Sequence, residues 1–254
     1  MTATWGLTID VARCHDCNNC FLACKDEFVG NDWPPYAKAQ PDRGQRWMNI
    51  LHRERGGYPL VAVAYLPKPC QHCKNPPCLK AAHNGAVTVR QDGIVLIDPN
   101  KAVGQKQLVE ACPYGAIFWN ETLQSPQKCN MCAHLLDEGW KEPRCVQVCP
   151  TGAMQAFKLT GDEWERLIKE DGLSRYSPEQ ETKPRVLYKN LKRFTHGFIA
   201  GSVAFADTDE CVENAQVLLM DKQGQTIAET QTNNYGDFRL SGLKEAPCSL
   251  WVSI

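Results

Sequence analysis

The sequence has no long apolar run and no recognisable targeting segment at its start. Its longest apolar stretch, Leu60–Leu66, falls far short of the ~20 residues that span a bilayer. The first residues, MTATWGLTID, have no basic start, no apolar core of signal-peptide length and no twin arginine. We therefore expect a cytoplasmic chain with no direct membrane span.

The sequence also lacks an excess of charge of either sign. Its 254 residues include 28 Lys and Arg and 29 Asp and Glu, which leaves a formal charge of −1. Domains that bind nucleic acids usually carry a clear basic excess, so no nucleic-acid partner is expected. In the C-terminal β domain, no Gly-rich phosphate loop and no nucleophile beside an obvious base stand out, so we expect no chemistry there.

Cysteine, in contrast, is abundant. Twelve of the 14 cysteines lie between Cys14 and Cys149, and the other two, Cys211 and Cys248, stand alone and are expected to be free thiols. A disulfide framework is typical of a shorter secreted chain, whereas clustered cysteines in a reducing compartment more often bind metal. The cysteine-rich part has many prolines and few periodic runs, so its order is expected to depend on metal ligation.

The clustered cysteines form four motifs. In chain order, the motifs are Cys14, Cys17, Cys20 and Cys24; Cys70, Cys73 and Cys78; Cys112; and Cys129, Cys132, Cys145 and Cys149. The first has the C-x2-C-x2-C-x3-C spacing of bacterial ferredoxins, in which the fourth cysteine binds the cluster of a partner motif. At this spacing, the positions that lack a thiol in motifs two and three are Ala82, Ala102, Gln105 and Leu108.

The crossed-ligand rule selects one pairing of the motifs. If motif one pairs with four and motif two with three, every cysteine has a place and one whole site is lost. Each of the two other pairings leaves one site with only three cysteines and one cysteine, Cys149 or Cys24, that belongs to no site. The nested pairing predicts three 4Fe–4S clusters, with these ligands: set one, Cys14, Cys17, Cys20 and Cys149; set two, Cys24, Cys129, Cys132 and Cys145; set three, Cys70, Cys73, Cys78 and Cys112.

Zinc is the main alternative to iron, since four-cysteine zinc sites also use C-x2-C pairs. Four cysteines between Cys14 and Cys24 are packed tightly for one tetrahedral ion, and the Cys-Pro endings at Cys112 and Cys149 fit clusters better. A zinc-stabilised interaction module is therefore the less favoured interpretation, and a purely structural role for the clusters is a further alternative. Metal analysis separates the metals, with about twelve irons expected against about three zincs.

An internal repeat indicates how the chain is organised. CPYGA at 112–116 and CPTGA at 149–153 are near copies, which suggests a duplicated cluster-binding fold. We expect an α+β protein with these parts: a duplicated bacterial-ferredoxin-like domain at 1–172, with an insertion at about 25–69; a linker at 173–197; and a small antiparallel β-sandwich-like domain at 198–254. The spacing of apolar residues predicts a short helix over 161–172, and turn signals punctuate the strands after 198.

Four stretches of the chain carry a wider resemblance. They are CHDCNNCF at 14–21, RGQRWMNI at 43–50, QKCNMCAHLLD at 127–137 and KPRVLYKNLKRF at 183–194. With the four-motif layout, they resemble the iron–sulfur (β) subunits of the dimethyl sulfoxide reductase family of molybdopterin oxidoreductases. Those subunits normally bind four clusters. Because it lacks one site, this chain is similar to the small subunits of the pyrogallol–phloroglucinol transhydroxylase and resorcinol hydroxylase type.

The resemblance implies a partner and a reaction. A large subunit with a molybdenum bis-pterin cofactor would carry the active site, in a heterodimer or larger assembly. The clusters of this chain would relay or store electrons while that subunit hydroxylates or transhydroxylates polyhydroxylated benzenes. The alternative is the same role beside another molybdopterin oxidoreductase, such as a catechol dehydroxylase. The C-terminal domain resembles carboxypeptidase-regulatory or transthyretin-like modules, which implies docking or stabilisation.

Histidines and lysines flank the predicted ligands. They are His15, His72, His134, Lys25, Lys74 and Lys128. The histidines either donate hydrogen bonds that tune cluster potentials or are exposed, and the lysines either offset cluster charge or are solvated. The aromatic and arginine residues of the insertion fit either a partner interface or a cover over the clusters.

Overall fold

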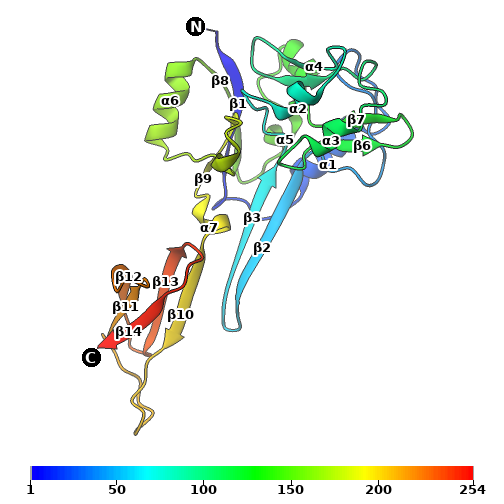
Figure 1. Ribbon diagram of the computed structural model, residues 1–254. Coiled ribbons are helices and arrows are strands. Elements are labelled where there is room, and N and C mark those ends of the chain that lie inside the picture. The colour runs from blue at the N-terminus through cyan, green and yellow to red at the C-terminus, as the bar shows by residue number, and fades with distance from the viewer. Residues whose placement is uncertain (1, 254) are drawn as a thin grey trace. The chain divides into compact units, whose positions relative to one another are not determined.

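The computed structural model describes residues 2–253 and divides the chain into two units (Figure 1). The first unit runs to Leu191 but leaves out Arg53–Ala64, and the second combines Arg53–Ala64 with the chain from Lys192 onward. The first contains short helices and small sheets, whereas the second consists mainly of antiparallel strands. The α+β class predicted from the sequence is therefore confirmed.

A three-stranded sheet in the order β8–β1–β9 organises the first unit (Figure 1). β1 (Thr4–Asp10) lies in the middle, antiparallel to β8 (Met154–Leu159) and parallel to β9 (Val186–Lys189). Leu7 and Ile9 of the middle strand are almost completely buried. The sheet therefore joins the beginning of the cysteine-rich region to its end.

The segment 173–197, predicted as an extended linker, contains the third strand of this sheet. Tyr188 of β9 is fully buried, and its hydroxyl donates to the carbonyl of Pro67 at 3.1 Å and accepts from the Gln71 amide at 3.2 Å. The boundary between the units accordingly falls after Leu191. A four-residue strand that pairs with a distant strand has too little local periodicity to be recognised in the sequence.

The cysteine motifs lie on short helices and on the turns before them. In chain order, these helices are α1 (Asn19–Phe28), α2 (Pro77–Ala81), α3 (Gln107–Glu110), α4 (Ala133–Asp137) and α5 (Arg144–Gln147). Three hairpins lie between them: β2–β3 (Asn49–Gly57, Leu60–Lys68), β4–β5 (Val87–Val89, Val95–Ile97) and β6–β7 (Phe118–Asn120, Ser125–Gln127). Two small groups of buried side chains in the described residues collect around cysteines of these motifs.

The helix predicted over 161–172 is α6 (Gly161–Glu170), which begins with a capping box at Thr160. The indole N–H of Trp164 donates a hydrogen bond to the carbonyl of Thr4 at 3.2 Å, and this bond connects the helix to β1. A Cβ on Gly6 would lie 2.7 Å from the Trp164 ring, which explains the glycine in the middle strand. The short helix η1 (Pro178–Gln180) follows before β9.

The second unit contains two small antiparallel sheets and the short helix α7 (Lys192–Thr195). The strands are β10 (Gly197–Ser202), which pairs with β13 (Asp237–Leu243), and β11 (Gln216–Met220), which lies between β12 (Thr226–Gln231) and β14 (Ser249–Ser253). A small apolar core includes Val217 and Leu219 of β11 and Phe238 and Leu240 of β13. Over residues 2–253, no helix has the length and apolar character needed to cross a bilayer.

Candidate iron–sulfur sites

Strand pairing brings the first and last cysteine motifs together. β1 ends shortly before Cys14, β8 begins shortly after Cys149, and Ile9 of β1 is paired with Met154 of β8. Because the strands are antiparallel, the chain segments that leave them at this end lie beside each other. The four thiols of set one line one small cavity, and they are Cys14, Cys17, Cys20 and Cys149.

The thiols of set one lie in different surroundings. Cys17 is exposed, whereas Cys20 is buried and burial raises its pKa to about 12. Burial also acts to raise the pKa of Cys149, but hydrogen bonds from Met154, Thr151 and neighbouring amides outweigh it, so the pKa lies below the ordinary value. Donors of this kind stabilise a thiolate, the form that binds metal.

Set two forms a second, deeper site. Cys24 lies one helical turn after Cys20 on α1, so the same helix contributes to both sites. The thiols of set two line a cavity together with apolar side chains such as Phe28 and Met48, and they are Cys24, Cys129, Cys132 and Cys145. Burial raises the pKa of Cys129 to about 11 and that of Cys24 well above its ordinary value.

Set three gathers Cys70, Cys73, Cys78 and Cys112. Burial is the main cause that raises the pKa of Cys73 to about 12. The other three thiols lie close enough to Cys73 for their charges to raise this pKa as well. The loop between Cys73 and Cys78 is held by the segment before β9. Here the amides of Lys74 and Asn75 donate to the carbonyls of Lys183 and Thr182 at 2.9 and 3.0 Å.

The three sets follow one another in space. Cys145 of set two is close enough to Cys20 of set one for an electrostatic interaction. On the other side, Cys129 of set two packs against the buried group that contains Cys70 and Cys73 of set three. Set two therefore lies between sets one and three, and the order of the sites is one, two, three.

The donor chemistry of these sites fits iron–sulfur clusters. Each predicted set brings four thiols together, which is the ligand number of a 4Fe–4S cluster. In the part of the protein that the structure describes, no three His, Cys, Asp or Glu side chains are placed to bind a single metal ion. None of the 14 cysteines, all of which the structure describes, forms a disulfide, and Cys211 and Cys248 are exposed.

Comparison with known proteins identifies the family. Residues 61–159 match the model of the 4Fe-4S dicluster domain. The chain is 48% identical over 240 residues to the pyrogallol hydroxytransferase small subunit of Pelobacter acidigallici, which covers 93% of this chain and 86% of that one. It is 34% identical over 206 residues to a subunit of the anaerobic dimethyl sulfoxide reductase of Escherichia coli (74% and 90%). It is 33% identical over 192 residues to a subunit of the tetrathionate reductase of Salmonella typhimurium (74% and 72%).

This protein belongs to the family of iron–sulfur subunits of molybdopterin oxidoreductases. The resemblance seen in the sequence is confirmed, as is the 4Fe–4S type of cofactor. The chain covers 86% and 90% of the first two relatives, so the similarity extends well beyond the cysteine motifs.

The positions of motif three at which ferredoxin spacing would place further ligands are packed within the protein. Ala102 and Leu108 are fully buried and lie in an apolar group that also includes Cys78. Gln105 accepts the His83 amide at 2.9 Å and donates to the His83 and Lys101 carbonyls at 3.2 and 2.8 Å. The Gln105 side chain thus joins the loops after motif two and before α3.

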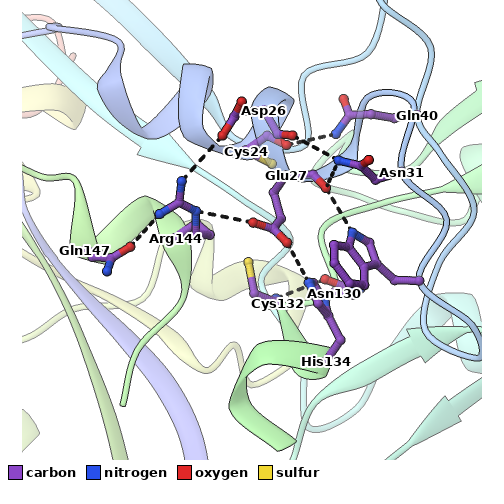
Figure 2. Close-up of polar contacts among 11 residues, drawn as sticks. Cys24, Asp26, Glu27, Asn31, Gln40, Asn130, Cys132, His134, Arg144 and Gln147 are labelled. Carbon is purple, nitrogen blue, oxygen red and sulfur yellow. Dashed lines mark hydrogen bonds and ion pairs between the residues drawn. The ribbon is translucent and has the colours of Figure 1, made fainter. Parts of the chain in front are cut away.

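A charged network fixes the helices around set two (Figure 2). Glu27, near the end of α1, bonds to His134 of α4 at 2.9 Å and to Arg144 of α5 at 3.3 Å. These three helices carry or adjoin Cys24, Cys132 and Cys145. One carboxylate therefore ties together the helices that carry or adjoin three of the four ligands of set two. The sequence contains no local pattern that predicts this network.

Part of the insertion covers set two. Trp47 is buried against Phe28, with ring centroids 4.8 Å apart, and Trp33 stacks on His134 at 4.4 Å. These contacts support the cover that was one of the two interpretations of the insertion. Tyr58, in contrast, is almost fully exposed.

The flanking residues separate into buried and exposed groups. His72 and His134 are buried, whereas His15 is exposed. Burial lowers the pKa of His72 well below its ordinary value, so this ring is neutral. Lys128 is only 4% exposed, whereas Lys74 is exposed. The sequence alone could not distinguish these cases, because every one of these residues lies beside or near a ligand.

Replacing Gln105 by alanine is expected to destabilise the first unit without removing iron. The change leaves the His83 peptide and the Lys101 carbonyl without their buried partner, which costs about 1–3 kcal/mol. The midpoint temperature of anaerobic unfolding should fall while the iron content stays constant. Gln107→Ala is the matched control, since its contacts are long, at 3.4 and 3.5 Å. Loss of iron in Gln105→Ala would show that the residue supports a metal site instead.

Replacing Glu27 by alanine is expected to weaken set two. The change leaves His134 and Arg144 without their carboxylate, at a cost of about 1.5–3 kcal/mol for a hydrogen bond to a charged group. We expect a lower unfolding midpoint and a partial loss of iron, measured by elemental analysis. Asp26→Ala is the control, because Asp26 is exposed and its contact with Arg144 is long, at 3.5 Å. Equal effects of the two changes would argue against a special role for Glu27.

Proposed function

We propose that this chain holds three 4Fe–4S clusters, at sets one, two and three, and relays or stores electrons for a larger catalytic subunit. The arrangement of three four-thiol sites in series is the observation that carries the proposal. Each cluster supplies one-electron transfer when bound. The fold positions the ligand cysteines and excludes water from set two. Set one reaches the surface, because its Cys17 is exposed.

The partner is proposed to be a large subunit with a molybdenum bis-pterin cofactor that hydroxylates or transhydroxylates polyhydroxylated benzenes. The similarity to the pyrogallol hydroxytransferase small subunit supports this choice. The second candidate is an electron-transfer role beside another molybdopterin oxidoreductase such as a catechol dehydroxylase. It is supported by the 34% and 33% identity to subunits of a dimethyl sulfoxide reductase and a tetrathionate reductase. A reducing compartment such as the cytoplasm is proposed, because clustered cysteines in such a compartment more often bind metal than form disulfides.

The filled fourth site suggests that the relay is short. Ala102, Gln105 and Leu108 occupy the region where ferredoxin spacing would place ligands. The proposed electron relay therefore contains three cluster sites and not four. A transhydroxylase moves a hydroxyl group between rings with no net redox change, so it needs no continuous outlet for electrons. A hydroxylase does need such an outlet.

The fold supports two finer proposals. The first unit is a duplicated ferredoxin-like fold, as the repeats at 112–116 and 149–153 and the crossed ligand sets suggest. The second unit is sandwich-like, because side chains of β11 and β13, from its two sheets, share one apolar core.

Paired cysteine substitutions test the ligand sets. Cys14→Ser with Cys149→Ser removes two ligands of one set, so iron should fall from about twelve to about eight atoms per chain. Cys14→Ser with Cys112→Ser touches two sets, so iron should fall to about four atoms. Cys211→Ser with Cys248→Ser should leave iron unchanged. If the first two variants lose the same amount of iron, the nested pairing is wrong; if zinc replaces iron throughout, the chain is no electron carrier.

The partner is tested by isolating the complex anaerobically from the native cell. A large molybdenum-containing subunit should co-purify, and the complex should act on pyrogallol or resorcinol. Turnover of pyrogallol without an external electron acceptor would support transhydroxylation, whereas strict dependence on an acceptor would favour hydroxylation. Activity on neither compound, with reduction of another substrate, would favour the second candidate function.

A further inference from the structure

Lys128 is a buried cation without a buried counter-charge. The side chain is 4% exposed, and its ammonium donates to two neutral groups, the carbonyls of Val95 and Cys129. Among residues 2–253, no carboxylate forms an ion pair with it. Burying an unpaired charge is costly, so a site of this kind calls for a compensating negative charge nearby.

The ammonium lies between two of the predicted cluster sites. Its charge acts on Cys129 of set two and on Cys78 and Cys112 of set three. These are also the sets that touch each other, because Cys129 packs against the buried group that contains Cys70 and Cys73. A cluster bound by four thiolates carries negative charge, which is the counter-charge that Lys128 lacks.

His72 provides a second donor at the same place. Its Nδ1 accepts the Val95 amide at 3.1 Å, and an amide can only donate, so the proton of this neutral ring is on Nε2. Within the described residues, Nε2 of His72 has no hydrogen-bond partner, although the residue is completely buried. The same Val95 residue thus holds His72 by its amide and Lys128 by its carbonyl. His72 lies between Cys70 and Cys73 of set three.

We propose that Lys128 and His72 set the reduction potentials of the clusters at sets two and three, Lys128 acting on both clusters and His72 donating to a sulfur of the cluster at set three. Reduction adds negative charge to a cluster, so a nearby cation or N–H donor stabilises the reduced form and raises the potential. The effect is strong here because both groups are shielded from water. Set one lacks such a pair among the described residues and would keep its potential. This inference rests on the proposed cluster sets.

The test is a redox titration of the purified holo-complex, monitored by electron paramagnetic resonance. Signals are assigned to sets with the cysteine variants described above. Lys128→Gln keeps a hydrogen-bond donor but removes the charge, so the midpoint potentials at sets two and three should fall while that at set one stays constant. Lys128→Arg keeps the charge and should remain close to the unaltered protein. Lys74→Gln is the matched control, because Lys74 also adjoins a ligand but is exposed, and it should change nothing.

His72→Asn gives an independent measurement. The asparagine oxygen can replace Nδ1 as the acceptor for Val95, whereas the asparagine NH2 group ends one bond short of the position of Nε2. The donor is therefore withdrawn from that position, and only the potential at set three should fall. Unchanged potentials in both Lys128→Gln and His72→Asn, with full iron content, would overturn the inference and leave the cluster sets intact. Fewer than three clusters in the unaltered complex would instead refute the proposed function. A shift at set two in His72→Asn would refute the assignment of its donor.

Discussion

The pairing of β1 with β8 is the constraint on which the arrangement of the sites depends. It joins two strands that lie at opposite ends of the cysteine-rich region and places Cys14 beside Cys149. Once this pair is fixed, α1 extends from set one to set two through Cys20 and Cys24. β9 then adds to the same sheet, and the segment before it holds the loop of set three. A small sheet thus positions sites that lie on short helices and turns.

The polar groups near set two are matched to its burial. Glu27 faces both His134 and Arg144, so the charges of three helices are compensated within one network. Lys128 differs, since it is equally buried but has only carbonyl partners. A network whose polar groups are all paired within the protein mainly fixes the geometry of the residues around it. A buried cation that has only carbonyl partners is instead available to stabilise negative charge nearby.

The positions at which ferredoxin spacing would place further ligands in motif three belong to the packed interior. Two of them, Ala102 and Leu108, are buried in an apolar group with Cys78. The third, Gln105, joins two loops by three hydrogen bonds to backbone groups. Apolar packing and backbone hydrogen bonds therefore stabilise this region.

Much of the site could be predicted from the sequence, because ligand spacing is a local property and the crossed-ligand rule restricts how motifs pair. The α6 helix and the strands of the second unit were within reach of such local patterns, and the thiols of each predicted set lie near one another in the structure. The role of 173–197 could not be predicted from local patterns, because β9 forms by pairing with β1, which is far away in the sequence. Nor could the sequence separate buried Lys128 from exposed Lys74, or reveal that Glu27 and Gln105 join distant segments. Burial and long-range hydrogen bonds are properties of the packed protein, so only the tertiary structure decided them.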